Sequence, residues 1–256
     1  MSLLDPQAVY ALWLRDVKRF VRTPSQVAGT LVFPLMFLVF LGTGFSDAAL
    51  PGIPAGVEYI QYLVPGIVGF TMLFGASFAV LAILGAQDTG FLTEILVAPV
   101  SRTSIVLGWI AGGATTALIQ GSLVFLIAIP LGFRVANPLL LPVVAVVLLL
   151  LAVTFVGFGV ALASQFSDTQ GFGLLIQFIV FPIFFLSGAL FPLSELPAVA
   201  QYLGRVNPLT YGVDALRGAL VGASTYPLAL DVLALGVSAA VMVAVGAWLF
   251  GRVESV

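Results

Sequence analysis

Residues that could carry out chemistry are few in this chain. It contains no histidine and no cysteine, so the commonest general base and the usual imidazole and thiolate metal ligands are absent. Its single lysine, Lys18, lies in RDVKRF with no glycine nearby, whereas a phosphate-binding loop needs G-x-x-x-x-G-K-[ST]. We therefore expect no metal site, no bound cofactor and no catalysis by this polypeptide alone.

One group of charged residues lies in the segment DTGFLTEILVAPVSR, residues 88–102. Its apolar residues recur at helical spacing: Leu92, Ile95 and Leu96. Asp88 and Glu94 favour the N-terminal half of a helix, and Pro99 ends it. A short helix that carries an apolar face outside the membrane requires a partner protein to cover that face.

A second group is Asp214 and Arg217, three residues apart in VDALRG. At that spacing an acid and a base can pair on one helix face. Charges near membrane depth are costly and are usually paired or functional. We expect a structural pair at the outer surface, and a functional role for the two residues stays open.

The elements that position these residues must be membrane helices. Hydrophobic residues make up 61% of the 256 residues and charged residues only 8%, against roughly 25% charged in soluble domains. Six uncharged stretches reach about the 20 residues that span a bilayer: 27–45, 59–87, 103–133, 135–167, 169–194 and 232–251. They are continuously apolar rather than alternating, which favours helices over a β-barrel. The formal net charge of −2 and the lack of a basic run exclude nucleic-acid binding.

Residues 3–22 precede the first span and form an amphipathic pattern. The apolar residues recur at helical spacing: Tyr10, Trp13, Leu14, Val17 and Val21. The basic residues fall on the other side: Arg15, Lys18, Arg19 and Arg22. This predicts a helix lying in the membrane surface, and a solvated basic leader is the alternative. Both interpretations place the N-terminus in the cytoplasm.

With six spans, the C-terminus is cytoplasmic as well, and the loops 46–58, 132–138 and 192–231 lie outside. Six of the nine Lys and Arg residues then lie inside, which agrees with the positive-inside rule. The outer segment from 186 to 226 is too apolar for a solvated loop and is broken by glycine and proline: Gly188, Pro192, Pro197 and Pro208. This predicts helices that dip into the membrane and return, packed in protein.

Taken together, these segments resemble the permease subunits of type 2 ABC exporters, a group that includes drug-resistance and nodulation-factor exporters. The first matching block lies within GFLTEILVAPVSR: Gly90, Leu92, Glu94, Ile95, Leu96, Pro99, Ser101 and Arg102. The second consists of FPIFFLSGALFPLSELP, residues 181–197, and NPLTYGVDALRG, residues 207–218, which includes Asn207, Pro208 and Tyr211. The resemblance covers essentially the whole chain as a single transmembrane domain, 1–256.

The resemblance implies a division of labour between subunits. Residues 88–102 would be the coupling helix that docks on a separate ATPase, with the apolar contact at Leu92, Ile95 and Leu96 and the polar contact at Glu94 and Arg102. Residues 3–22 would be the connecting helix, and 187–225 the re-entrant region. Two ATPase subunits would bind ATP and Mg, and a second permease copy or a paralogue would complete the path in the inner membrane of a prokaryotic cell. Relatives carry more charge around the coupling helix than Gln87 and Asp88 provide here, which leaves its individual charge contacts open.

Four residues within the spans are candidates for lining the path. Phe70, Phe74 and Phe78 form an i, i+4, i+8 stripe in the second span, and Gln177 lies inside the fifth. In the resembling family these two spans border the path between protomers. The alternative is that the three phenylalanines face lipid or a neighbouring helix.

Two other functions compete with an ATP-driven exporter. The Asn-Pro-Leu triplets at Asn137 and Asn207 suggest a passive channel of the aquaporin sort, but both fall on the outside, where an inverted repeat needs opposite faces. The other alternative is a membrane assembly protein without transport. For an exporter, the apolar and aromatic candidates favour a hydrophobic or amphipathic cargo, such as a drug-like molecule, a lipid or a lipid-linked glycan.

Overall fold

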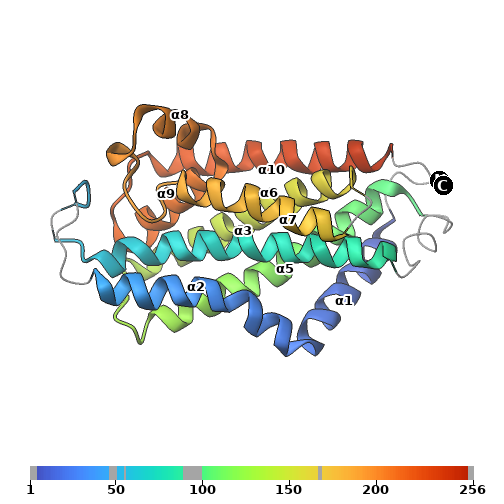
Figure 1. Ribbon diagram of the computed structural model, residues 1–256, viewed down its shortest axis with the longest axis horizontal. Helices are drawn as coiled ribbons and strands as arrows, with labels where there is room; N and C mark the ends of the chain where they lie inside the picture. Colours follow the sequence, from blue (N-terminus) through green and yellow to red (C-terminus); the bar gives the residue numbers. More distant parts are fainter. Residues whose placement is uncertain (1–4, 46–50, 55, 89–99, 167–168, 253–256) are drawn as a thin grey trace.

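The computed structural model describes residues 5–45, 51–54, 56–88, 100–166 and 169–252. Over these ranges the chain is helical and contains no strand (Figure 1). The elements are α1 (Pro6–Arg22), α2 (Pro24–Gly44), α3 (Tyr59–Asp88), α5 (Arg102–Ala128), η1 (Pro138–Leu140), α6 (Leu141–Ala163), α7 (Thr169–Phe185), η2 (Leu193–Glu195), α8 (Ala198–Val206), α9 (Pro208–Val221) and α10 (Leu228–Phe250). The predicted all-helical class is confirmed.

Five stretches of helix in the described residues are long and apolar enough to cross a membrane: Pro24–Gly44, Tyr59–Leu81, Arg102–Ala128, Pro138–Ala163 and Leu228–Phe250. The fifth predicted span is shorter than expected, because α7 ends at Phe185 rather than near 194. There the Ser187 hydroxyl donates to the Phe184 carbonyl over 2.7 Å, and Gly188 adopts φ 75°. The apolar stretch continues beyond the helix into a turn, so the length of the stretch overestimated the length of the helix. Six spans therefore stay a prediction.

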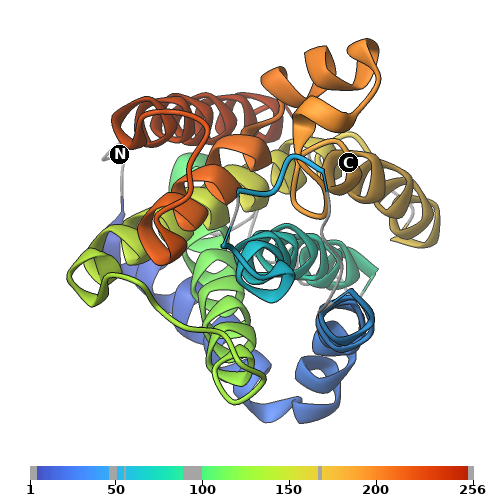
Figure 2. The ribbon, with the colours of Figure 1, turned by 90° about the vertical axis from the view of Figure 1, so that its left-hand side faces the viewer.

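Helix α3 lies at the centre of the bundle, with α2, α5, α6, α7 and α9 packed around it (Figure 2). Every residue from Tyr62 to Ser77 is buried. A helix that is apolar on all sides can occupy such a position, because it has no polar face to keep in water. The remaining long helices each leave one side uncovered, as α10 does opposite its contact with α6.

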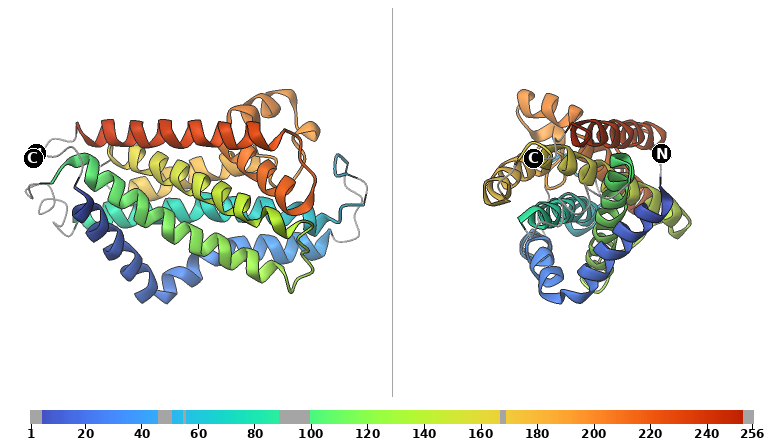
Figure 3. Two further views of the ribbon diagram at one scale, coloured as in Figure 1. Left: turned by 180° about the vertical axis from the view of Figure 1, so that it is seen from behind. Right: turned by 90° about the vertical axis from the view of Figure 1, so that its right-hand side faces the viewer.

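The bundle has two distinct ends (Figures 1 and 3). One, which we call the α1 end, carries α1, the last residue of α3, the first residue of α5 and the last residue of α10. The other, which we call the α9 end, carries η1, η2, α8 and α9. The two Asn-Pro-Leu triplets both lie at the α9 end, where the Ala136 amide donates to the Leu220 carbonyl over 2.8 Å, which argues against the aquaporin-like alternative.

Candidate functional site: the two ends of the bundle

At the α1 end, α1 packs along α5. Asp5 caps α1 by accepting from the amides of Gln7 and Ala8, and its own amide donates to the Ser104 hydroxyl over 2.7 Å. Further along, the Trp13 indole donates to the Thr115 hydroxyl over 3.0 Å. These bonds hold α1 to α5 over three turns.

The contact is close because α5 presents glycine to α1. A Cβ added at Gly108 would lie 2.8 Å from the Cβ of Leu12, and one at Gly112 would lie 2.8 Å from the Cβ of Asp16. Small residues allow helices in membranes to approach in this way. The seam therefore tolerates no side chain at these two positions.

Helix α1 has three sides rather than the two expected from its sequence. The predicted apolar side includes Tyr10 and Val21, which are exposed in the bundle. The predicted basic side is formed by Arg15, Lys18, Arg19 and Arg22, of which Arg15 is partly buried and the rest are exposed. A third side, with Leu12, Asp16 and Phe20, faces the protein. The helix is confirmed, whereas its position in a membrane surface stays a prediction.

The predicted coupling helix lies mostly outside the described residues. Gly90, Leu92, Glu94, Ile95, Leu96 and Pro99 all fall in the undescribed segment 89–99. Asp88 is the last residue of α3, and Arg102 is the first residue of α5 rather than the end of a separate helix. Ser101 caps α5 by accepting from the Ser104 amide, and Arg102 Nη1 donates to the Gly251 carbonyl over 2.8 Å.

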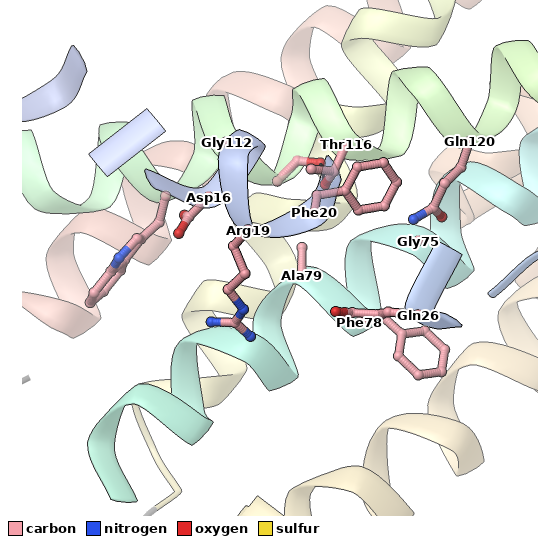
Figure 4. Close-up of a pocket in the computed structure, with 12 residues that line it drawn as sticks. Asp16, Arg19, Phe20, Gln26, Gly75, Phe78, Ala79, Gly112, Thr116 and Gln120 are labelled. Carbon is pink, nitrogen blue, oxygen red and sulfur yellow. Dashed lines mark hydrogen bonds between the residues drawn. The ribbon is translucent and has the colours of Figure 1, made fainter. Parts of the chain in front are cut away.

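A narrow polar cleft opens between α1, the first turn of α2, α3 and α5 (Figure 4). Asp16 and Arg19 come from α1, Phe78 from α3 and Gln120 from α5. Arg15 Nη2 donates to Asp16 Oδ1 over 2.7 Å. Burial raises the pKa of the Asp16 carboxyl above its ordinary value, and the positive charges of Arg15 and Arg19 oppose that rise.

The phenylalanine stripe joins three helices inside the chain. Phe70 is fully buried, with its ring centroid 4.2 Å from that of Phe184 on α7 and 5.9 Å from that of Phe37 on α2. Phe74 packs edge-on to Phe33, and Phe78 lines the polar cleft. Phe70 and Phe74 thus contact neighbouring helices, and a role of the stripe in lining the path stays a prediction.

Gln177 lies on the uncovered side of α7. It is exposed beside Leu174 and Phe178, the latter 80% exposed, and these residues line an open groove of about 320 Å³. Among the described helices α7 packs mainly against α3, which leaves its outer side to lipid or to another chain. This side stays a candidate for lining a path between protomers.

At the α9 end, Arg217 connects two parts of the chain. Its guanidinium donates to the carbonyls of Tyr62, over 3.3 and 3.4 Å, and of Gly188, over 3.2 Å, and lies 3.6 Å from the centroid of the Tyr62 ring. The Tyr62 hydroxyl also donates to the Gly188 carbonyl over 3.1 Å. A buried cation is thus satisfied by two backbone carbonyls and an aromatic face.

Asp214 does not pair with Arg217, so the predicted ion pair is wrong. In the described part of the chain no ion pair joins them. The Asp214 carboxylate instead accepts from the amides of Thr225 and Tyr226 over 2.8–2.9 Å. The two side chains diverge because one fixes the loop before α10 while the other reaches across to α3.

The remaining re-entrant residues shape the turns of this end. Asn207 caps α9 and donates to the Ile183 carbonyl over 2.6 Å, with Pro208 in the first turn. The Tyr211 hydroxyl donates to the Arg205 carbonyl over 2.6 Å. Pro192 precedes η2 and Pro197 precedes α8.

These turns enclose a polar cavity of about 380 Å³. Its lining includes Tyr62, Ser187, Arg205, Thr210, Asp214 and Arg217. Short helices, a broken backbone and a cavity are features expected of a re-entrant region, which stays a prediction.

The chain is similar in sequence to known membrane transport proteins. The sequence profile of the family described as ABC-2 type transporter matches residues 7–221. Nodulation protein J of Rhizobium meliloti (strain 1021) is 30% identical over 232 residues, which cover 88% of this chain and 86% of that protein. Inner membrane transport permease YadH of Escherichia coli (strain K12) is 31% identical over 228 residues, 86% of each chain.

The chain belongs to the ABC-2 type transporter family. The predicted resemblance to type 2 ABC permeases is thereby confirmed. The matched region contains both ends of the bundle, from α1 to the last residue of α9. As an ABC transporter permease, the chain is a transmembrane subunit.

Three functional candidates in this ABC-2 chain escaped sequence reasoning. Trp109 and Gln120 on α5 and Asp231 on α10 have buried side-chain polar atoms with no hydrogen-bond partner in the described residues. Gln120 was detectable as an amide within an uncharged stretch. Asp231 was assigned to the loop before the last span, whereas it lies in the first turn of α10 and is fully buried.

Proposed function

We propose that this chain is the membrane permease of an ATP-driven exporter in the inner membrane of a prokaryotic cell. Two permeases, either two copies or one copy with a paralogue, would associate with two separate ATPase subunits. ATP and Mg would be bound by those subunits, and this chain would bind no cofactor. The family match supports the permease role.

The proposal rests mainly on the features that lie together at the α1 end, namely the two ends of the coupling segment and the basic side of α1. The segment assigned to the ATPase leaves α3 at Asp88 and enters α5 at Arg102, which is bonded to the C-terminal turn of α10. The basic side of α1 lies at the same end. Basic segments favour the cytoplasmic side of a membrane, so we place the α1 end, both termini and the ATPase contact in the cytoplasm.

Helix α3 provides a direct mechanical connection through the bundle. It runs without interruption from Tyr59 to Asp88, and at 1.5 Å per residue its 30 residues extend about 45 Å. Near its far end, Tyr62 is bonded to Arg217 and to the Gly188 turn. Closure of the ATPases on ATP binding would displace segment 89–99, and α3 would transmit that displacement to the re-entrant region.

The uncovered sides of α2 and α7 provide the second element of the proposal. Phe40 on α2 and Leu174 on α7 are 67% and 65% exposed. We assign α7, with Gln177, to the face toward the other permease. A path bounded by such side chains suits a hydrophobic or amphipathic cargo, and export is the direction in which the cargo leaves past the α9 end.

The coupling assignment can be tested by charging the apolar side of segment 89–99. The double variant Leu92→Glu/Leu96→Glu, co-expressed with an ATPase subunit that carries a phosphate loop, should lose association with that subunit in affinity purification. The matched control is Val199→Glu/Leu203→Glu on α8, where both residues are exposed at the opposite end. The control should retain the ATPase.

Association that survives the first double variant would show that the coupling assignment is wrong. If ATPase binding is intact but no amphiphile stimulates ATP hydrolysis by the reconstituted complex, the chain is an assembly protein rather than a transporter. The two measurements therefore separate a wrong contact from a wrong function.

A further inference from the structure

Helix α1 exposes two adjacent sides to the outside of the bundle. Its apolar side carries Tyr10 and Val21, which are 59% and 67% exposed. Its basic side carries Lys18 and Arg22, which are exposed as well. With 3.6 residues per turn, Val21 and Arg22 point about 100° apart around the helix, so the two sides share an edge. An apolar side next to a charged one is typical of a helix at the boundary between lipid and water.

The charges of Lys18 and Arg22 are not used inside the chain. The ion pair within α1 joins Arg15 to Asp16, over 2.7 Å, and Arg19 lines the polar cleft. Within the described ranges neither Lys18 nor Arg22 has a hydrogen bond, an ion pair or a ring contact. These two side chains can therefore bind an anion outside the chain.

The length of α2 places the end of α1 at a membrane boundary. Helix α2 has 21 residues, and at 1.5 Å per residue it is about 31 Å long, close to the roughly 30 Å of a hydrocarbon core. It begins at Pro24, directly after the last turn of α1. The start of α2 thus marks one boundary of the core, and Val21 and Arg22 lie at the level of the lipid head groups.

From that boundary α1 runs away from the core. Helix α3 has 30 residues and a length of about 45 Å, so it is about 14 Å longer than α2. In Figure 1, α1 leaves the start of α2 and runs toward the end of the bundle where α3 ends. The basic residues nearest α2 therefore cross the head-group layer, which is roughly 5–8 Å thick on each side.

The charge of this segment selects among head groups. From Arg15 to Arg22 the chain has four basic residues and one acid, Asp16. A phosphatidylcholine head group brings a cation of its own beside its phosphate, whereas phosphatidylglycerol brings a phosphate without a cation. Each Lys or Arg near an anionic surface strengthens membrane binding by about fivefold. An anionic lipid is thus the better complement to this part of α1.

We propose that the two exposed sides of α1 bind an anionic phospholipid leaflet. Lys18 and Arg22 contact the phosphates, Val21 lies at the boundary with the acyl chains, and Tyr10 lies among the head groups. This assigns a lipid class to a helix whose sequence indicates only that it is amphipathic. The proposal requires that the chain spans a membrane, and it does not depend on ATP-driven export.

The first test counts the lipids that the full chain retains. It is placed in nanodiscs of equal parts phosphatidylcholine and phosphatidylglycerol, and the lipids that remain after brief detergent extraction are counted by mass spectrometry. We expect phosphatidylglycerol to be enriched at least about fivefold, the contribution of one basic residue. The enrichment should fall when salt is raised from about 0.1 to about 1 M, because the screening length shortens from about 10 to about 3 Å.

The double variant Lys18→Gln/Arg22→Gln should reduce the enrichment at least threefold. Its matched control is Arg134→Gln/Arg205→Gln, which removes two exposed arginines at the α9 end and should retain the enrichment. In discs of phosphatidylcholine alone both double variants should unfold at the temperature of the parent chain, because none of the four residues forms an ion pair with a described residue. That measurement separates loss of the lipid from loss of the fold.

A second test measures where α1 lies. The chain has no cysteine, so Val21→Cys provides a single site for a fluorophore. Nitroxide-labelled phosphatidylglycerol should quench this fluorophore at least threefold more than phosphatidylcholine with the same label. The control is Val199→Cys on α8, which is 72% exposed at the other end of the bundle and should be quenched equally by the two lipids.

Equal retention of the two lipids would overturn the proposal. So would an enrichment that Lys18→Gln/Arg22→Gln leaves unchanged, since the anionic lipid would then bind elsewhere on the chain. A fluorophore at Val21→Cys that neither lipid quenches would show that α1 is a solvated basic leader. If inorganic phosphate added to phosphatidylcholine discs raises the unfolding temperature as much as phosphatidylglycerol does, the basic side binds soluble anions instead of a leaflet.

Discussion

The two ends of the bundle treat buried polar groups in opposite ways. At the α9 end, Arg217 donates to two carbonyls and the Asp214 carboxylate accepts from two loop amides. At the α1 end, Asp16 Oδ2, Trp109 Nε1 and Gln120 Oε1 have no partner among the described residues. These buried polar groups of the α9 end form their hydrogen bonds within the chain, whereas those of the α1 end can still form hydrogen bonds with another molecule.

The difference shows that a buried charge is not by itself a sign of a ligand site. In the sequence, a functional role for Asp214 and Arg217 stays open, and in the structure their hydrogen bonds fix turns and connect the re-entrant region to α3. The cleft beside α1 also carries two charged residues, Asp16 and Arg19, but Asp16 Oδ2 and Gln120 Oε1 have no donor among the described residues. What distinguishes the ends is which hydrogen bonds remain to be made.

The largest expected effect is at Arg217. In Arg217→Leu the carbonyls of Tyr62 and Gly188 lose a charged donor, and bonds to charged groups contribute roughly 1.5–3 kcal/mol each. We expect the unfolding temperature in detergent to fall by about 6–24 °C, at roughly 2–4 °C per kcal/mol for a chain of this size. The matched control is Arg205→Leu, which removes an exposed arginine of the same cavity and should change the temperature little. Equal effects would contradict the assignment of Arg217 as a buried clamp.

A smaller effect is expected at the seam between α1 and α5. Gly112→Val places atoms where the Cβ of Asp16 lies, and overpacking costs about 1–3 kcal/mol. The unfolding temperature should fall and trypsin should cleave faster after the arginines of α1. Gly236→Val provides the control, since a Cβ at Gly236 meets nothing within 4 Å. A seam that tolerates valine would mean that α1 is not held against α5 in solution.

The smallest effect is the pH dependence from Asp16. Its pKa in the folded chain is raised above the ordinary 3.8 by burial, so the folded protein holds this proton more tightly than the unfolded one. The stabilisation is present below about 3.8 and is lost as the pH rises through the raised pKa. Relative to Asp16→Asn, the parent chain should lose about 1–2 °C of unfolding temperature over that window. An unchanged difference across the window would show that Asp16 is not buried as described.

Sequence reasoning identified helices well and their ends less well. Continuous apolar stretches predicted α2, α3 and α10 within a few residues, because a membrane helix must satisfy its own backbone bonds over a fixed length. It placed the end of α7 nine residues late, since the residues of the Gly188 turn are also apolar. Composition reports burial in the membrane but not where the backbone turns within it.

The functional site was likewise predictable only in part. Motifs in residues 88–102 and 181–218 predicted the family, which the comparisons confirmed. They could not predict that Asp214 and Arg217 face different partners, because those partners lie on α3 and on the loop before α10. Nor could helical periodicity reveal the third side of α1, since it was judged from apolar and basic residues alone, and Asp16 is neither.

By itself, the sequence determined that this chain is a helical membrane protein without a phosphate loop, because apolar length and missing residue types are local properties. The resemblance to permeases rested on motifs in two short segments. Only the tertiary structure decided which polar groups are satisfied. That outcome depends on contacts such as Arg217 with Tyr62 and Asp16 beside Gly112, between residues far apart in the chain. Hydrogen bonds are short and directional, so their completion can be judged only when the helices that bring donors and acceptors together are in place.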